Sequence, residues 1–459
     1  MFRRVALPAL LLLLAALWAA PAAPPAKPVP SVDLFFKAAS PDDSTADAAL
    51  AEIAAGWKDG YGGLIVDEAS LMQRTALGNP FSLIRFLEAQ TGQKFGSNLS
   101  RWREWLWSLP YDPHPGYGPF KGALYALIDR RFEDFFREPF KSSIRLDQVE
   151  WGGVGVNGIP PLDHPKHIAG REATYLQDGN VVFGVYAGGQ TRAYPKRILA
   201  WHELALDRVG DVDLALVYCT LCGTVIPYNS RVGSTTYTFG TSGLLYLSNK
   251  LMFDAETHSL WSSLDGTPVI GPLMGAGLHL SLLPVVTTTW GEWRRKHPDT
   301  TVLSLDTRYR RDYSEGAAYR DYFSTDALMF QVPAIDRRLR NKDEVLVPRL
   351  TEDTGEKPLV IATGFLQAHR IFHVPVAPQR LVVVTTATGA NHVYESGSHR
   401  FATAVDDDHV VDAEGEMWIV EENELRSARD PKLVLPRVPA HRAFWFGWFA
   451  QHPDTLLIK

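Results

Sequence analysis

The chain has 459 residues, of which 46% are apolar and 21% are charged. This apolar content excludes an intrinsically disordered chain, and the length favours two or three domains. The 46 Lys and Arg residues against 52 Asp and Glu residues give a net charge of −6, and no basic stripe accompanies it, which argues against a nucleic-acid-binding protein.

The N-terminal segment predicts export from the cytoplasm. Arg3 and Arg4 precede an apolar run rich in Leu and Ala, and small residues follow at Ala20 and Ala22, as in a secretory signal peptide. We therefore expect a signal peptide over residues 1–23, a Pro/Ala leader over residues 24–31, and a periplasmic or secreted mature protein. The apolar run is too short for a membrane span, so we expect no stable span after cleavage.

Residues 32–145 show the apolar periodicity of helices. One stripe with helical spacing consists of Trp102, Trp105, Leu106 and Leu109. A second stripe runs from Leu124 to Phe136, and Pro139 would end its helix. We predict an all-α domain here, in which the tryptophans are core residues rather than a platform for a ligand.

From about Trp151 the pattern changes to short β-branched runs between turn residues, in a chain with 36 Gly and 31 Pro residues. The predicted strands include Val181–Tyr186, Leu214–Tyr218, Thr224–Tyr228 and Thr235–Phe239. The fold class that follows is α+β, with an all-α N-terminal domain followed by a β-rich, internally duplicated α+β domain.

The duplication is inferred from one specific match. Trp290-x-x-Trp293-x-x-x-His297-Pro298-Asp299-Thr300 recurs as Trp445-x-x-Trp448-x-x-x-His452-Pro453-Asp454-Thr455. Three weaker matches pair Asp254/Trp261 with Asp412/Trp418, Leu214–Tyr218 with Leu381–Thr385, and Gly184–Pro195 with Gly364–Pro375. We define a first half (150–330) and a second half (340–459). The alternative is a chance match with a shared helix-to-strand connection.

The chain has only two cysteines, Cys219 and Cys222, which is too few for a disulfide-stapled scaffold. Gly223 stands where covalent haem attachment requires His, so c-type haem is excluded. The pair lies between two strand-like runs, whereas a thioredoxin-type centre needs a helix N-terminus. The second half has Thr385–Gly389 at the corresponding place, so such a hairpin does not require thiols.

Two thiolates on a tight turn can chelate a soft metal ion. The nearest further ligands are His202 and Met252, and a mixed Cys, His and Met set favours copper over zinc. Two alternatives remain open, namely a redox-active dithiol, and an inert disulfide or a pair of buried thiols.

Several ordered motifs carry a family resemblance. They are Gly158-Ile159-Pro160-Pro161-Leu162-Asp163-x-Pro165, Arg192-Ala193-Tyr194-Pro195, His202-Glu203, Tyr218-Cys219-x-Leu221-Cys222-Gly223, Phe239-Gly240-x-Ser242-Gly243-Leu244-Leu245-Tyr246 and Ser259-Leu260-Trp261. Over residues 150–455 the chain resembles the bacterial family called domain of unknown function 3179, whose name implies no activity. The resemblance implies that the family retains His202, Cys219, Cys222, Ser242, Asn249, Met252, Asp254 and Trp261. The chain departs from the family pattern at Leu206, Thr220 and His258.

Three functional hypotheses follow. The first is an exported protein with one soft-metal site, copper preferred and zinc possible, held by Cys219, Cys222, His202 and Met252. Possible lining residues of that site are Glu203, Ser242, Asn249 and Asp254. The second is a thiol–disulfide oxidoreductase that uses the same cysteines, and the third is a non-catalytic module that binds an extracytoplasmic partner or a glycan. We expect an unidentified extracytoplasmic partner or metal donor, and neither haem, nucleotide nor nucleic acid; the sequence does not decide whether the protein is an enzyme.

Overall fold

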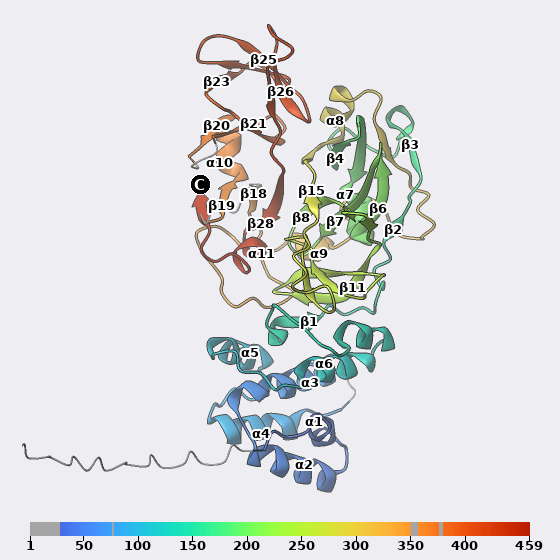
Figure 1. Cartoon of the computed structure of the whole chain (residues 1–459), viewed down its shortest axis with the longest axis vertical. Coiled ribbons are helices and arrows are strands. Elements are labelled where there is room, and N and C mark those ends of the chain that lie inside the picture. Colours follow the sequence, from blue (N-terminus) through green and yellow to red (C-terminus); the bar gives the residue numbers. More distant parts are fainter. Residues whose placement is uncertain (1–27, 76–77, 350–356, 376–379) are drawn as a thin grey trace, which may run out of the picture.

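A computed structural model describes residues 28–75, 78–349, 357–375 and 380–459 of the protein (Figure 1). The predicted signal peptide and the first residues of the predicted leader lie outside the described residues. Residues 28–31, which end the leader, precede the first helix without regular structure. Within the described residues, no helix is both long and apolar enough to cross a membrane.

The chain begins with a helical region, as its periodicity predicts. Its helices are α1 (Val32–Ala38), α2 (Asp43–Ala55), η1 (Asp59–Tyr61), α3 (Gly62–Thr75), α4 (Phe81–Thr91), α5 (Leu99–Ser108), α6 (Tyr117–Ala126), η2 (Arg130–Phe136) and η3 (Leu146–Gln148), where η denotes a 3₁₀ helix. Trp102 and Leu106 are buried in α5 as expected. The second predicted stripe is divided between α6 and η2, because Asp129 starts a new helix by accepting a hydrogen bond from the Arg131 amide.

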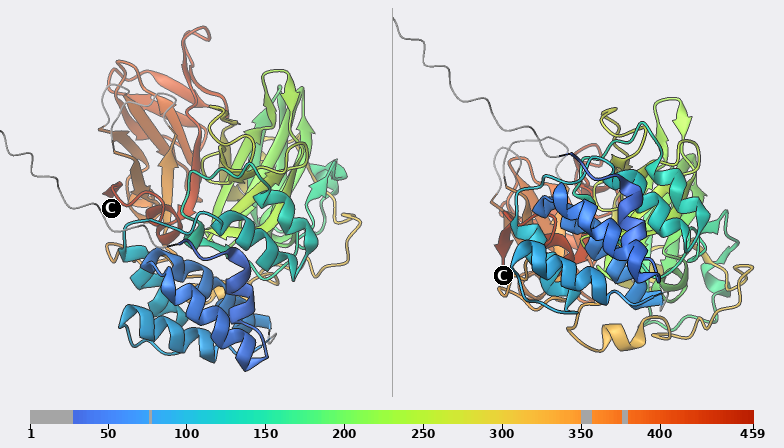
Figure 2. Two further views of the ribbon diagram at one scale, coloured as in Figure 1. Left: turned by 60° about the horizontal axis from the view of Figure 1, so that its bottom comes forward. Right: turned by 90° about the horizontal axis from the view of Figure 1, so that it is seen from below.

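The helices lie at one end of the molecule, against the β-rich region (Figures 1 and 2). Their core continues into the nearest sheet, since Leu244, Leu251, Phe253 and Leu260 pack in the same apolar cluster as the helices. Burial of this shared apolar surface joins the two regions.

The first half of the β-rich region contains three five-stranded sheets and a short hairpin. Its elements are β1 (Val149–Trp151), β2 (Leu162–Asp163), β3 (His167–Ala169), η4 (Gly170–Glu172), β4 (Val181–Ala187), β5 (Gln190–Pro195), α7 (Lys196–His202), β6 (Leu204–Val209), β7 (Val212–Cys219), β8 (Thr224–Asn229), β9 (Arg231–Val232), β10 (Thr235–Thr236), β11 (Phe239–Tyr246), β12 (Asn249–Asp254), β13 (Leu260–Ser262), β14 (Pro268–Ile270), β15 (Ser281–Leu282), β16 (Val285–Thr289), α8 (Trp290–Lys296) and β17 (Thr301–Leu303). The predicted strand Thr235–Phe239 is not one strand, because β10 ends at Thr236 and β11 begins at Phe239.

The second half lies beside the first (Figures 1 and 2). Its elements, preceded by α9 (Arg320–Phe323), are β18 (Glu344–Pro348), β19 (Leu359–Ala362), α10 (Thr363–Ala368), β20 (Ile371–Val374), β21 (Leu381–Thr385), β22 (Asn391–Glu395), β23 (Phe401–Ala404), β24 (His409–Asp412), β25 (Met417–Val420), β26 (Glu424–Ser427), β27 (Val434–Pro436), β28 (Ala440–Phe444), α11 (Trp445–Phe449) and β29 (Leu456–Ile458). Strand β8 contacts β28 and strand β16 contacts β22, so each half supplies a strand to the contact between them.

One sheet of each half has the same strand order. It is β16-β4-β5-β17 in the first half and β28-β18-β19-β29 in the second, and in both the last pair is parallel. Helices α8 and α11 connect corresponding strands, and the indoles of Trp293 and Trp448 donate to Thr300 and Thr455 over the same 2.9 Å. The proposed match of Gly184–Pro195 with Gly364–Pro375 is wrong, because the former is the β4–β5 hairpin and the latter covers α10 and β20.

Candidate functional site

The two cysteines lie at the turn that joins β7 to β8. Cys219 ends β7 and pairs with Thr224 at the start of β8, and the Cys222 amide donates to the Cys219 carbonyl over 3.2 Å. Gly223 closes the turn with a φ of +60°, a conformation that favours glycine. We call residues 219–223 the cysteine turn. It is the strand–turn–strand arrangement that the sequence predicts.

Both thiols are free and buried. Cys219 is 3% exposed and Cys222 is fully buried. The Cys222 thiol donates to the Ser248 carbonyl over 3.2 Å, and Cys219 lies at the other end of the same turn. Gly447 of α11 also lies against Cys222, since a Cβ at Gly447 would be only 3.2 Å from Cys222 Sγ. The absence of a side chain at Gly447 therefore makes room for this sulfur.

A buried ion pair lies beside the cysteine turn. Lys250 Nζ is 2.9 Å from Glu203 Oε2, and these side chains are 5% and 8% exposed. Glu203 Oε1 accepts hydrogen bonds from the hydroxyls of Thr220 (2.7 Å) and Tyr319 (3.0 Å), while Lys250 Nζ also donates to the Glu203 carbonyl (3.0 Å). Because Thr220 belongs to the cysteine turn, the carboxylate holds the turn against β12. The pair satisfies its charges through mutual contact and hydrogen bonds, as a buried ion pair requires.

The two thiols differ in acidity. Burial and the negative charge of Glu203 raise the pKa of Cys219, but the neighbouring Cys222 thiol, the Lys250 amide and the Lys250 ammonium outweigh them and hold the pKa below its ordinary value. Burial raises the pKa of Cys222 well above its ordinary value, and the neighbouring Cys219 thiol and its charge add to the rise. Cys219 is therefore the more acidic of the two thiols and Cys222 the less acidic one.

A cleft of about 60 Å³ reaches the cysteine turn. Its lining includes Leu221 from the middle of the turn and the polar side chains of Glu203, Thr241, Lys250 and Tyr319, and its other walls are mainly apolar. Of the cysteine turn only Leu221 lines this cleft, and the two sulfurs lie behind its wall.

His202 is turned away from the sulfurs. Its Nδ1 lies 2.8 Å from the Pro160 carbonyl, and its Nε2 lies 2.6 Å from the Tyr313 hydroxyl. The ring is fully buried beside Tyr309, and burial lowers the pKa of His202. Both ring nitrogens already have partners, so the imidazole positions the loop at Tyr313 rather than the cysteine turn.

The other predicted site residues divide into two groups. Asn249 is near the cysteines, because its amide donates to the Gly447 carbonyl over 2.8 Å, and its buried Oδ1 has no partner among the described residues. Met252 packs in a different apolar cluster from the cysteines. Ser242 donates to the Leu251 carbonyl over 2.6 Å, and Asp254 accepts from the Trp261 indole over 2.8 Å. These last three side chains are part of the packing and hydrogen bonding of their strands.

Sequence reasoning missed Lys250, Tyr319 and Gly447. Only a weak signal in the sequence marked Lys250, which directly precedes the apolar run Leu251–Phe253. Gly447 and Tyr319 lie far from the cysteines in the sequence, and only the contact of α11 and of the segment before α9 with the cysteine turn brings them to the site.

Around the two sulfurs the structure brings no third ligand from the predicted set. Across the described ranges, no group of three or more His, Cys, Asp or Glu residues has a geometry suited to a metal ion. The site is therefore a buried dithiol beside an ion pair, on a β-rich α+β scaffold.

The chain belongs to the family described as "protein of unknown function (DUF3179)", whose sequence profile matches residues 156–455. This match confirms the resemblance that the motifs of the β-rich region indicate. No curated protein and no solved structure matches the chain.

Proposed function

We propose that Cys219 and Cys222 form a redox-active dithiol that cycles to an intramolecular disulfide by thiol–disulfide exchange. The observation that carries this proposal is the presence of two free thiols in one turn whose pKa values are displaced in opposite directions. A low-pKa thiol beside a protonated partner is the arrangement in which one sulfur attacks and the other resolves.

The reaction balances with a low-molecular-weight disulfide as oxidant. The Cys219 thiolate attacks one sulfur of that disulfide and forms a mixed disulfide, and the other sulfur leaves as a thiolate that takes up a proton. Cys222 then loses its proton, its sulfur attacks Cys219 Sγ, and the second small thiol leaves with that proton. Two protein thiols and one small disulfide thus become one protein disulfide and two small thiols.

The burial of the pair favours a small reagent over a folded protein partner. Cys219 is only 3% exposed, and the adjoining cleft of about 60 Å³ has Leu221 and Lys250 in its walls. Lys250 supports the reaction twice, since its ammonium favours the Cys219 thiolate and its amide donates to that sulfur. Glu203 keeps the ammonium in place through the 2.9 Å ion pair.

The proposal is tested by equilibrating the purified full chain with glutathione buffers of graded potential and counting free thiols by mass spectrometry. We expect a reversible Cys219–Cys222 disulfide with a potential above about −300 mV, because structural disulfides lie below that value. Cys219→Ser and Cys222→Ser should each abolish it. An absence of interconversion, or a potential below that limit, would contradict the proposal.

The soft-metal hypothesis is a second candidate, because thiolate pairs bind Cu(I) and the two sulfurs adjoin each other. Metal analysis of the same preparation separates the two functions. One equivalent of copper or zinc that is lost in Cys219→Ser would replace the redox proposal, whereas metal-free protein with a cycling disulfide supports it. If both serine variants keep wild-type stability and cellular phenotype, only the hypothesis of a binding module survives.

We also propose that the protein is exported and loses residues 1–23. The basic start, the apolar run and the small residues at the expected cleavage site support this proposal. N-terminal sequencing of the protein from a periplasmic or culture fraction should begin at or near Pro24. A full-length chain confined to the cytoplasm would overturn the proposal.

Finally, we propose that the two halves arose by duplication. The shared strand order of one sheet, the recurring Trp–Thr hydrogen bond and the recurring Trp–Asp hydrogen bond (Trp261–Asp254 and Trp418–Asp412) support this origin. An experimental structure in which these two sheets superpose strand for strand would agree with it, and different strand directions would not.

A further inference from the structure

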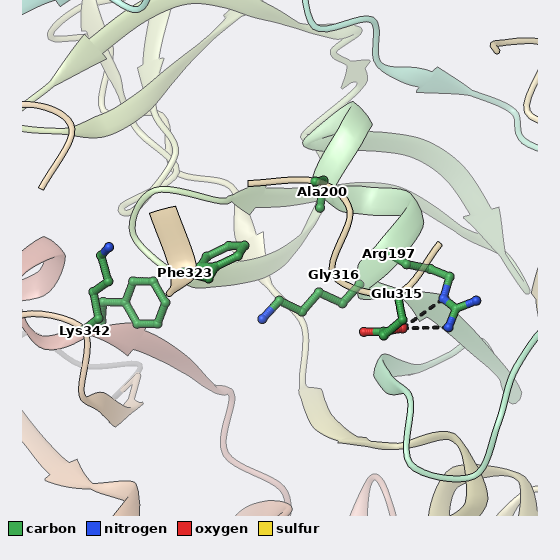
Figure 3. A pocket seen from close by; sticks show the side chains of 9 residues that line it. Arg197, Ala200, Glu315, Gly316, Phe323 and Lys342 are labelled. Atoms are coloured by element: carbon green, nitrogen blue, oxygen red, sulfur yellow. Dashed lines mark hydrogen bonds and ion pairs between the residues drawn. The ribbon is translucent and has the colours of Figure 1, made fainter. Parts of the chain in front are cut away.

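A second cavity, separate from the cleft at the cysteine turn, lies where the two halves and the segment between them meet. Its volume is about 360 Å³, which is within the range of small-molecule sites. Its walls come from α7, the segment before α9, α9 itself, Lys342 and Phe444 of β28. Figure 3 shows Arg197 and Glu315 at one end, Lys342 at the other and Phe323 between them.

The charges that line this cavity are unequal. Lys196, Arg197 and Lys342 supply three cations, and Glu315 is the one carboxylate in the lining. Glu315 is bound to Arg197, with 2.8 Å between Oε2 and the guanidinium. Two positive charges therefore remain without a carboxylate in the cavity, which favours an anionic ligand.

Of the three cations, Lys196 has its donors free. Arg197 uses its remaining donors on Asn180 Oδ1 (2.8 Å) and on a backbone carbonyl (3.0 Å). The Lys342 ammonium donates to two backbone carbonyls, one of them that of Thr325 at 2.7 Å. Lys196 Nζ has neither a hydrogen bond nor an ion pair with any described residue, and it lies 4.7 Å from the centre of the Phe323 ring. An ammonium in a cavity without a partner is a ready point of attachment for one negative charge.

The remaining walls are apolar. Phe323 and Phe444 stand edge to face with their ring centres 6.3 Å apart, and Ala200 and Ala318 complete the apolar side of the lining. A ligand that fills this space needs a flat apolar body as well as its charge. Because the guanidinium fork of Arg197 is already occupied, the site lacks the paired donors that a phosphate would use.

We propose that this cavity binds a small aromatic monocarboxylate, with the carboxylate on Lys196 and the ring against the wall that Phe323 and Phe444 form. This binding site does not rest on the proposed redox function, but the cavity borders the dithiol, because the Phe444 amide donates to the Cys222 carbonyl over 2.7 Å. The ligand bridges the two halves, since Lys196 belongs to the first and Phe444 to the second.

The test is titration calorimetry of the full chain with three probes, namely 1-naphthoate, neutral 1-naphthamide and inorganic phosphate. We expect 1-naphthoate to bind one molecule per chain, and 1-naphthamide to bind at least about tenfold more weakly because it lacks the charge. Phosphate should not displace 1-naphthoate. Equal binding of acid and amide, no binding of the acid, or displacement by phosphate would each overturn the proposal.

Variants locate the site. Lys196→Met should weaken 1-naphthoate at least about tenfold and leave 1-naphthamide unchanged, whereas Lys58→Met, at an exposed lysine of the helical region, should change neither. Ala200→Phe fills the cavity and should abolish binding of both probes. Thermal unfolding midpoints show whether each variant is folded, and unchanged naphthoate affinity in folded Lys196→Met would contradict the proposed attachment point.

Discussion

The cysteine turn of the first half and the corresponding turn of the second half differ in chemistry but not in position. We call residues 386–389 the threonine turn; it joins β21 to β22 and closes at Gly389 with a φ of +92°, as the cysteine turn closes at Gly223. The hydroxyls of Thr386 and Thr388 both bond to Glu292 of α8. Each turn therefore meets a helix of the opposite half, α8 for the threonines and α11 for the cysteines.

The residues that meet the turns occupy the same place in their helices. Glu292 directly precedes Trp293, and Gly447 directly precedes Trp448. In α8 the residue is the carboxylate Glu292, and it faces the hydroxyls of the threonine turn. In α11 the residue is Gly447, and it faces the sulfur of Cys222. The hairpin and its helix thus form a common frame, and the side chains at the contact decide whether the contact is a hydrogen-bonded one or a dithiol.

The ion pairs beside the two turns are reversed in sign. After α7 the anion Glu203 pairs with Lys250, and after α10 the cation Arg370 pairs with Asp407, 2.8 Å away. The first pair is nearly buried, whereas the side chains of the second are 35% and 24% exposed. Only the first lies beside thiols, and its cation is the one that favours a thiolate. The difference is that the first half has a buried ion pair beside two thiols where the second has a half-buried pair beside hydroxyls.

The largest effect is expected when Gly447 of α11 is replaced by glutamate, the residue that α8 has at the corresponding position, Glu292. Gly447→Glu forces a Cβ to within 2.9 Å of Cys222 Cβ and buries a carboxylate without the threonines that Glu292 has. We expect a loss of about 5 kcal/mol in the free energy of unfolding, or failure to fold. Urea denaturation measures it. Glu292→Gly, the reverse exchange, should cost clearly less, and equal costs would contradict the difference between the two contacts.

A smaller effect should separate the two ion pairs. Lys250→Met leaves Glu203 buried without its cation, so we expect a loss of about 4 kcal/mol. The matched variant Arg370→Met removes the cation of the exposed pair and should cost at most about 1 kcal/mol. Lys250→Met should also raise the pKa of Cys219, which the pH dependence of thiol alkylation measures. Equal shifts of the pH dependence of thiol alkylation in Lys250→Met and Arg370→Met would contradict the role given to Lys250 in the redox proposal.

One part of the pH dependence of stability should come from the contact of the second half. His392 lies three residues after Gly389, where the first half has Ile226 three residues after Gly223. Burial lowers the pKa of His392 to about 4, although Glu422 opposes this shift. As the pH falls below about 6.5, His392 binds a proton in the unfolded chain but stays neutral in the folded chain. The free energy of unfolding therefore decreases.

Between pH 7 and pH 5 this decrease should amount to about 2 kcal/mol, and it should be absent from His392→Ile, which carries the first-half residue. Denaturation curves at both values of pH measure it. Glu422 keeps His297 at 3.2 Å in that variant. An unchanged slope of stability against pH in His392→Ile would assign the effect to another group.

The smallest effects should be equal in the two halves. Thr300→Val and Thr455→Val each remove the acceptor of a buried indole, Trp293 and Trp448 respectively, over the same 2.9 Å. We expect about 1 kcal/mol for each variant by urea denaturation. If the losses in the free energy of unfolding of the two variants differ by more than the error of the measurement, the recurring hydrogen bond does not have the same surroundings in both halves.

Local patterns predicted most of the elements. The helical stripe at Trp102 and Leu106, the strands at Val181 and Leu214 and the turn at Cys219 are present where the sequence places them. The strand expected over Thr235–Phe239 was divided, because short β-branched runs carry no signal for where pairing stops. Spacing alone also misaligned Gly364–Pro375, since equal distances between Gly and Pro occur in unrelated elements.

The candidate site was predicted only in part. Cys219, Cys222, Glu203 and Asn249 were found because they lie in or next to the motifs. The imidazole of His202 was expected at the sulfurs, but α7 ends with this ring against Pro160 and Tyr313. Sequence proximity could not show this, because the direction of a side chain depends on which elements pack around it.

What the amino-acid sequence determined by itself was local: helical periodicity, β-branched runs, a glycine that permits the turn, and two thiols separated by two residues. The tertiary structure decided what those thiols face. Lys250, Tyr319 and Gly447 reach them from other elements of the fold, and Lys196 and Phe444 come together in the lining of one cavity between the halves. Charge, hydrogen bonding and free space around a reactive group depend on distances between elements, and these distances are set only when the elements pack.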